Sequence, residues 1–182
     1  RVLTVTGVQT CALPICGNAR DELNAVGVRH MAKDGYDRLD EFEPPAVPGD
    51  VVLRIDNRDR EESPDLYAID IRKPNEQGHY WDLQVFTPTN GNRTYITFDG
   101  LGYIPQEYDV FLINKTTQQA KNLEWESSYH FANTGSDRYL RQNLRLVIGT
   151  KDFVNENNAG VNLYPDARSE ERRVGKECRS RW

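Results

Sequence analysis

The stretch His79–Thr87 constrains the fold more than any other part of the chain. Trp81, Leu83 and Val85 alternate there with mainly polar side chains. A period of two is typical of a β-strand that has one face on a core and the other toward solvent. Because similar runs lie on both sides of it, we interpret this stretch as a central strand of an antiparallel β domain.

Strand-like runs recur along the chain, and short turn-forming segments such as Thr89-Asn-Gly-Asn92 separate them. No convincing helical pattern lies between the runs. This spacing predicts an all-β protein, an immunoglobulin-like antiparallel β-sandwich of about eight strands. The expected strands are Val51–Asp56, Leu66–Arg72, His79–Thr87, Arg93–Phe98, Tyr108–Asn114, Gln119–Glu124, Ser128–Asn133 and Asn143–Gly149.

The same alternation predicts which side chains form the core. Burial of each large apolar side chain is worth roughly 1.5–3 kcal/mol, which suffices for one domain without disulfides. We expect the inward side chains to be Leu53, Ile55, Tyr67, Ile69, Ile71, Trp81, Leu83, Val85, Ile96, Phe98, Val110, Leu112, Tyr129, Phe131, Leu144, Leu146 and Ile148.

Both ends of the chain resemble translated sequencing adapter rather than natural protein. The last fifteen residues, Arg168–Trp182, match such a translation codon for codon, and the eleven residues Val5–Ile15 match the opposite adapter. The next adapter base fits a Cys codon at position 16. We therefore exclude residues 1–16 and 168–182 from the fold prediction, and we expect residues 1–15 and 169–182 not to pack against the sandwich.

The remaining segments divide the chain as follows. Residues 17–48 are expected to form an extended, proline-containing leading segment, because Pro44, Pro45 and Pro48 are incompatible with a helix or a sheet interior. Residues 49–150 form the β-sandwich domain. Residues 151–167, with the Asn-rich stretch Asn155–Asn158, are expected to be a linker.

Charge and cysteine content limit the partners of this chain. It has 23 basic and 28 acidic residues, and removal of the two adapter-like ends leaves 16 basic and 25 acidic residues, a net charge of −9. Such an acidic surface disfavours nucleic acid and anionic membranes as partners. No apolar run reaches the ~18 residues of a membrane-spanning helix. We also expect the protein to be a monomer. The cysteines all fall in the adapter-like ends. Residues 17–167 therefore contain no cysteine, which excludes disulfides and Cys-based zinc sites within that stretch.

An acidic segment is the candidate metal site. Asp34, Asp37 and Asp40 follow one another at three-residue intervals beside a glycine, and carboxylate oxygens on a flexible loop suit calcium. The spacing is not that of an EF-hand loop. The alternative is that these carboxylates form Asx turns or pair with nearby arginines.

The sequence contains no strong catalytic motif. The three histidines lack metal-ligand spacing, and no serine lies in a nucleophile-elbow context. Asp70 and Asp82 could be imagined as a glycosidase pair, but each alternates outward on a strand, and cross-strand pairing with Arg72 explains them better. We therefore expect no enzymatic activity and no cofactor other than the calcium considered above.

Aromatic residues offer a second kind of site. Trp125 stands at the end of a predicted strand, near Tyr129 and Tyr139 in the sequence. Exposed rings there would stack against sugars, whereas a Trp at this position more often closes one end of a sandwich core. An exposed row of two or more aromatics from Trp125, Tyr129, Tyr139 and Tyr80 would favour a carbohydrate-binding module.

Several segments together resemble a β-sandwich accessory module found near the C-terminus of secreted bacterial surface proteins, often just before a type IX secretion sorting domain or an FlgD-like domain. The matching segments are Lys33-Asp-Gly-Tyr-Asp-Arg-Leu-Asp-Glu-Phe-Glu-Pro-Pro45, Ala68–Arg72 with Trp81–Val85, Ile104-Pro-Gln-Glu-Tyr-Asp-Val-Phe-Leu-Ile-Asn114, Tyr129-x-Phe131 and Leu144–Gly149. Asn114 stands where the family usually has Asp, and the chain passes into the adapter-like end at the point where the family usually has a sorting domain.

This resemblance implies an extracellular or cell-surface location and a non-catalytic role in display or spacing. The implied partners are the neighbouring domains of the parent protein. It supplies no ligand, and extracellular polysaccharide stays open as the ligand of the alternative, carbohydrate-binding function.

Overall fold

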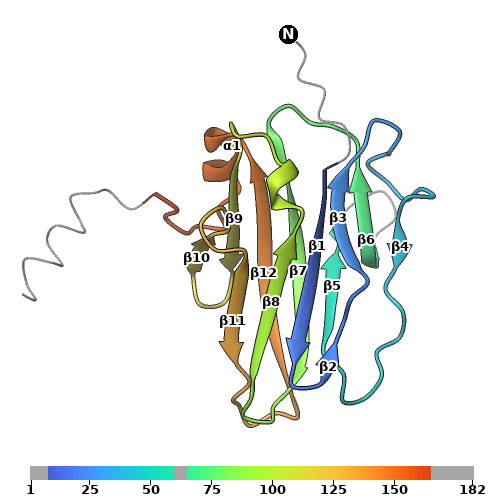
Figure 1. Ribbon diagram of the computed structural model, residues 1–182, viewed down its shortest axis with the longest axis vertical. Coiled ribbons are helices and arrows are strands. Elements are labelled where there is room, and N and C mark those ends of the chain that lie inside the picture. Colours follow the sequence, from blue (N-terminus) through green and yellow to red (C-terminus); the bar gives the residue numbers. More distant parts are fainter. Residues whose placement is uncertain (1–7, 60–64, 165–182) are drawn as a thin grey trace, which may run out of the picture.

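The computed structural model describes residues 8–59 and 65–164, and these residues form an all-β fold. Strands account for 48% of the chain and helices for 6%, and one large sheet curves into a nearly barrel-shaped structure (Figure 1). The all-β prediction is therefore confirmed. The finer assignment to an eight-stranded immunoglobulin-like sandwich is not confirmed.

All eight runs that alternate in the sequence are strands. The bounds differ from the predicted ones by a residue or two, except that the last strand begins four residues earlier. These strands are β5 (Val52–Asp56), β6 (Leu66–Arg72), β7 (Gly78–Pro88), β8 (Arg93–Asp99), β9 (Asp109–Asn114), β10 (Gln119–Asn122), β11 (Ser128–Ala132) and β12 (Tyr139–Gly149). A short 3₁₀ helix, η1 (Leu101–Tyr103), follows β8.

Four further strands lie in the part of the chain that the sequence left outside the domain. They are β1 (Val8–Cys16), β2 (Ala19–Arg20), β3 (Asn24–Val28) and β4 (Glu41–Phe42). The expectation that residues 1–15 do not pack is thus wrong from Val8 onward, and residues 17–48 are not merely an extended leading segment. The adapter-like tail 168–182 lies outside the described residues.

The order of the strands in the sheet is β10-β9-β12-β7-β5-β6-β3-β1-β8-β11, with β2 on β1 and β4 on β6. Neighbouring strands are antiparallel except β3 and β6, which run parallel. The sheet is therefore mixed, which corrects the purely antiparallel prediction. The two end strands, β10 and β11, lie on the same side of the molecule (Figure 1), where residues of both line one small pocket.

The core lies inside the curved sheet. Trp81, Leu83 and Val85 on β7 are fully buried there, as the alternation predicts. Tyr129 and Phe131 on β11 pack against this core but are only half-buried, because β11 is an end strand, and Ile69 on β6 is half-buried as well. The other predicted inward side chains are all buried.

A close backbone approach joins β7 to β12. Gly78 pairs with Gly149, and a Cβ atom built on Gly78 would stand 2.3 Å from the carbonyl oxygen of Ile148. Gly78 also has a φ of +135°, a conformation that side chains disfavour. These two glycines let the strands start and end in register at the end of the sheet where the apolar pocket described below lies.

The segment after β12 is folded, which corrects its expected role as a linker. Thr150 caps α1 (Lys151–Glu156), with its side chain accepting a hydrogen bond from the Phe153 N–H. Val154, Val161 and Leu163 are buried in a second apolar cluster against the outer face of β9 and β12. Residues 151–164 therefore cover part of the sheet.

Candidate functional site

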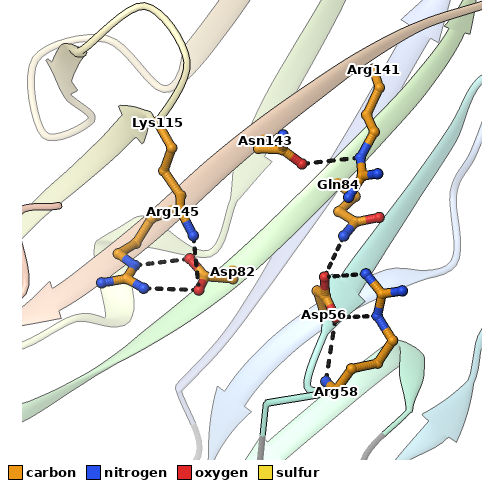
Figure 2. Close-up of polar contacts among 8 residues, drawn as sticks. All are labelled: Asp56, Arg58, Asp82, Gln84, Lys115, Arg141, Asn143 and Arg145. Atoms are coloured by element: carbon orange, nitrogen blue, oxygen red, sulfur yellow. Dashed lines mark hydrogen bonds and ion pairs between the residues drawn. The ribbon is translucent and has the colours of Figure 1, made fainter.

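The outer face of β5, β7 and β12 carries a groove of about 570 Å³ lined mainly by charged and amide side chains. Alternation explains its composition, because residues between the buried positions of β7 and β12 point away from the core. Figure 2 shows Arg145 and Lys115 turned toward Asp82, and Arg58 and Gln84 turned toward Asp56.

Asp82 is the most strongly paired group in this groove. Arg145 donates from Nε and Nη2 to its two carboxylate oxygens, both at 2.8 Å, and Lys115 Nζ lies 3.3 Å from Oδ2. Burial raises the pKa of Asp82, but the bonds and charges of Arg145 and Lys115 outweigh it and hold this pKa below its ordinary value. The guanidinium of Arg145 also covers the ring of Tyr80 at 4.1 Å.

A second cluster surrounds Asp56. Arg58 donates from Nε and Nη2 to the Asp56 carboxylate, both at 2.8 Å, and the Gln84 amide donates to Oδ2. Nearby, Arg141 Nε donates to Asn143 Oδ1 at 3.1 Å, and both Arg54 and Arg141 lie over the ring of Phe86. The polar groups of the groove are thus largely paired with one another.

Asp70 is not an outward residue, which corrects the sequence interpretation. Asp70 and Arg72 are both buried, two residues apart on β6, with Arg72 Nε 2.9 Å from Asp70 Oδ2. Asn57 Nδ2 donates to the same oxygen, and Arg72 Nη1 donates to the Tyr80 carbonyl. The pair therefore lies along one strand rather than across two, and it does not meet Asp82 in a carboxylate pair.

The acidic segment forms turns. Asp37 accepts hydrogen bonds from the backbone N–H groups of Lys33 and Leu39, and Asp40 accepts from those of Asp37 and Ile71, all at 2.7–2.8 Å. Burial raises the pKa of Asp40, although these backbone bonds oppose it.

The third carboxylate of this segment, Asp34, is exposed and forms an ion pair with Lys73. No cluster of three or more ligating side chains exists within residues 8–59 and 65–164. The structure therefore shows the turn-forming alternative for Asp37 and Asp40 and gives the calcium hypothesis no site.

The candidate sugar-binding aromatics do not form one row. Trp125, in the loop between β10 and β11, is 87% exposed, so it does not close the core. Tyr129 is half-buried, accepts a hydrogen bond from Asn114 and lines a small pocket between β10 and β11. Tyr139 accepts one from the Gly49 N–H and lies at the other end of the sheet, beside Pro88. Tyr80 is half-buried under Arg145.

An apolar pocket of about 180 Å³ at one end of the molecule is the site that the sequence did not indicate. It is lined by residues from the end of β3, the ends of β7 and β12, and the segments around Pro74 and Ile104. Trp81 and Thr10 belong to its wall. The pocket could not be predicted because it joins segments that lie far apart in the sequence.

The described chain thus offers a paired polar groove, an exposed Trp125 and an apolar pocket. No helix in the described ranges is long and apolar enough to span a membrane. Searches for similar proteins found no family model, no curated protein and no solved structure that matches this chain.

Proposed function

We propose that this chain is a non-catalytic structural module of a secreted or cell-surface bacterial protein, an immunoglobulin-like sandwich that acts as a stiff spacer or docking face. Its partners are the neighbouring domains of the parent protein, and it works as a monomer. The acidic surface supports this function, because like-charged neighbouring copies repel one another.

The observation that carries the proposal is the pairing within the polar groove. Catalysis needs at least one acid, base or nucleophile that is oriented toward a substrate. Here Asp82 is clamped by Arg145 and Lys115, and Asp56 is clamped by Arg58 and Gln84. Both carboxylates are used to tie neighbouring strands together, which is the use expected of a rigid module.

Assays of turnover test this function. The full chain is incubated with chromogenic glycosides, esters, peptides and phosphates, beside Asp82→Asn, Asp56→Asn and the control Asp50→Asn at an exposed position. We expect no turnover from any of them. Turnover that disappears in Asp82→Asn or Asp56→Asn but persists in Asp50→Asn would show that the groove is an active site.

Carbohydrate binding is the second candidate function, and the exposure of Trp125 favours it. The indole ring presents an open face for the C–H groups of a sugar. The pocket between β10 and β11, with Gln119, Lys121 and Tyr129, adds polar groups close to the loop that carries Trp125. Polysaccharide would then be bound at the open side of the curved sheet.

Glycan arrays and pull-downs with insoluble polysaccharides separate the two functions. Sugar binding predicts millimolar to micromolar affinity that is lost in Trp125→Ala and kept in Tyr103→Ala, which removes another exposed aromatic ring, at the end of η1. Retention that depends on Trp125 would overturn the spacer function. Retention unchanged in Trp125→Ala would remove the proposed platform.

A further inference from the structure

Two residues that line the apolar pocket have buried polar atoms that the described residues do not satisfy. Trp81 and Thr10 line it, and each is only 1% exposed. The Trp81 indole N–H and the Thr10 hydroxyl have no hydrogen-bond partner among the described residues. An unpaired buried donor destabilises the fold, so a molecule that supplied an acceptor here would remove that cost.

The rest of the pocket determines the character of such a molecule. Val26, Val28, Ile104 and Ile148 contribute apolar wall, and the ring of Tyr108 lies beside them. Glu76 and His30 are exposed, which places them at the rim, whereas His79 is half-buried with its ring 5.5 Å from that of Trp81. Because a buried charge is costly without a buried partner, the wall favours an uncharged ligand.

The volume of the pocket limits the size of the ligand. A dry apolar cavity of about 150 Å³ holds a benzene molecule, and this pocket measures about 180 Å³. It therefore suits a ring with one small substituent, roughly six to nine non-hydrogen atoms. An indole N–H can only donate a hydrogen bond, so the ligand must carry an acceptor.

We propose that this pocket binds a small, uncharged, mainly apolar molecule with one hydrogen-bond-accepting oxygen, such as an aromatic ketone, aldehyde or phenol. The oxygen accepts a bond from the Trp81 indole N–H, and the Thr10 hydroxyl adds a second polar contact. The ring packs against the aliphatic wall. The site is independent of the paired groove and of Trp125.

Acetophenone and isopropenylbenzene are the matched probes, because the second replaces the carbonyl oxygen of the first with a CH2 group. Each is titrated into the ¹⁵N-labelled full chain while the indole N–H signals are followed. The Trp81 signal is identified by its loss in Trp81→Phe. We expect acetophenone to move the Trp81 signal, to leave the Trp125 signal in place, and to bind roughly tenfold more tightly than isopropenylbenzene.

A pocket-filling variant keeps the test valid if Trp81→Phe does not fold. Val28→Phe replaces an isopropyl group in the pocket wall with an aromatic ring and should abolish binding of acetophenone. Val47→Phe, at an exposed position, should not. A Trp81 signal that neither probe moves would overturn the proposal, since the pocket then holds water only. Equal affinity for both probes would also overturn it, because the indole N–H would not be what the pocket uses.

Discussion

Strands β7 and β1 each have a neighbour on both sides in the sheet, but their side chains relate to the core in opposite ways. On β7, the large residues Trp81, Leu83 and Val85 point inward. On β1, the buried positions from Thr10 onward carry Thr, Ala, Pro and Cys, and the larger Ile15 points outward and is 40% exposed. Both strands pair with neighbours on either side, so the difference between them lies mainly in their residues rather than in their place in the sheet.

The fit of β1 is poor in three respects. Thr10 brings an unpaired hydroxyl into the core. Ala12 and Thr10 border a small internal cavity together with Asn24, whose side-chain amide is buried and has no hydrogen-bond partner within the described ranges. Pro14 lacks a backbone donor, although it lies between strands. Strand β7 also carries a buried donor without a partner, the Trp81 indole N–H, but its large inward side chains and its pairing agree with the fold.

This difference shows what backbone pairing can and cannot do. Main-chain hydrogen bonds are available to almost any sequence, so a chain of arbitrary origin can add a strand to a sheet. Agreement of local pattern, packing and polar satisfaction marks a sequence selected for its fold. The misfit of β1 is what the adapter interpretation of residues 1–16 leads one to expect, and that origin stays a prediction.

Truncation on each strand should give the largest contrast. Trp81→Ala removes a fully buried ring and should lower the free energy of unfolding by on the order of 3–5 kcal/mol. Ile15→Ala removes an outward side chain of β1 and should change it by less than about 0.5 kcal/mol. Urea denaturation measures both. A loss from Ile15→Ala close to that from Trp81→Ala would erase the distinction between the strands.

The same substitution on two strands sharpens the comparison. Thr94 on β8 is buried and bonds Thr87 Oγ1 at 3.0 Å and Asn133 Oδ1 at 2.9 Å, so Thr94→Val should cost about 1–3 kcal/mol. Thr10→Val removes a hydroxyl that has no partner and should leave stability unchanged or raise it by up to about 1 kcal/mol. Denaturant midpoints decide, and equal losses would mean that the Thr10 hydroxyl is satisfied.

Glu43 and Asp82 should contribute to the pH dependence of stability with opposite signs. Burial, followed by the Asp21 carboxylate, raises the pKa of Glu43 to about 7 from an ordinary 4.5, although Arg54 opposes this. The folded state then holds the proton more tightly, so stability falls as pH rises from about 4.5 to about 7. Asp82 has a lowered pKa, so its contribution is lost only as pH falls below about 3.8.

Melting temperatures at pH 5 and pH 8 test this last prediction. The full chain should melt at a lower temperature at pH 8, and Glu43→Gln should reduce the difference, because it removes the titrating group. Asp82→Asn serves as the control and should leave the difference between these two pH values unchanged. A pH dependence that Glu43→Gln does not alter would show that other groups cause it.

Much of the candidate polar groove follows from alternation. Asp82 and Gln84 point outward because their neighbours on β7 point inward, and the sequence predicts this directly. The partners of Asp82 could not be predicted, since Arg145 reaches it from β12 and Lys115 reaches it from the turn between β9 and β10. Burial of Asp70 with Arg72 was missed for a related reason: a charged residue is buried only where the tertiary structure brings partners such as Asn57.

The sequence by itself determined the eight strands from β5 to β12 and most of their inward side chains. It could do so because alternation is a local property that each strand carries within its own residues. Only the tertiary structure decided that β3 runs parallel to β6, that β1 lies between β3 and β8, and that residues 151–164 cover the sheet. The first two outcomes depend on long-range backbone pairing, which almost any side chains permit. The third depends on apolar packing of Val154, Val161 and Leu163 against strands that lie far away in the sequence.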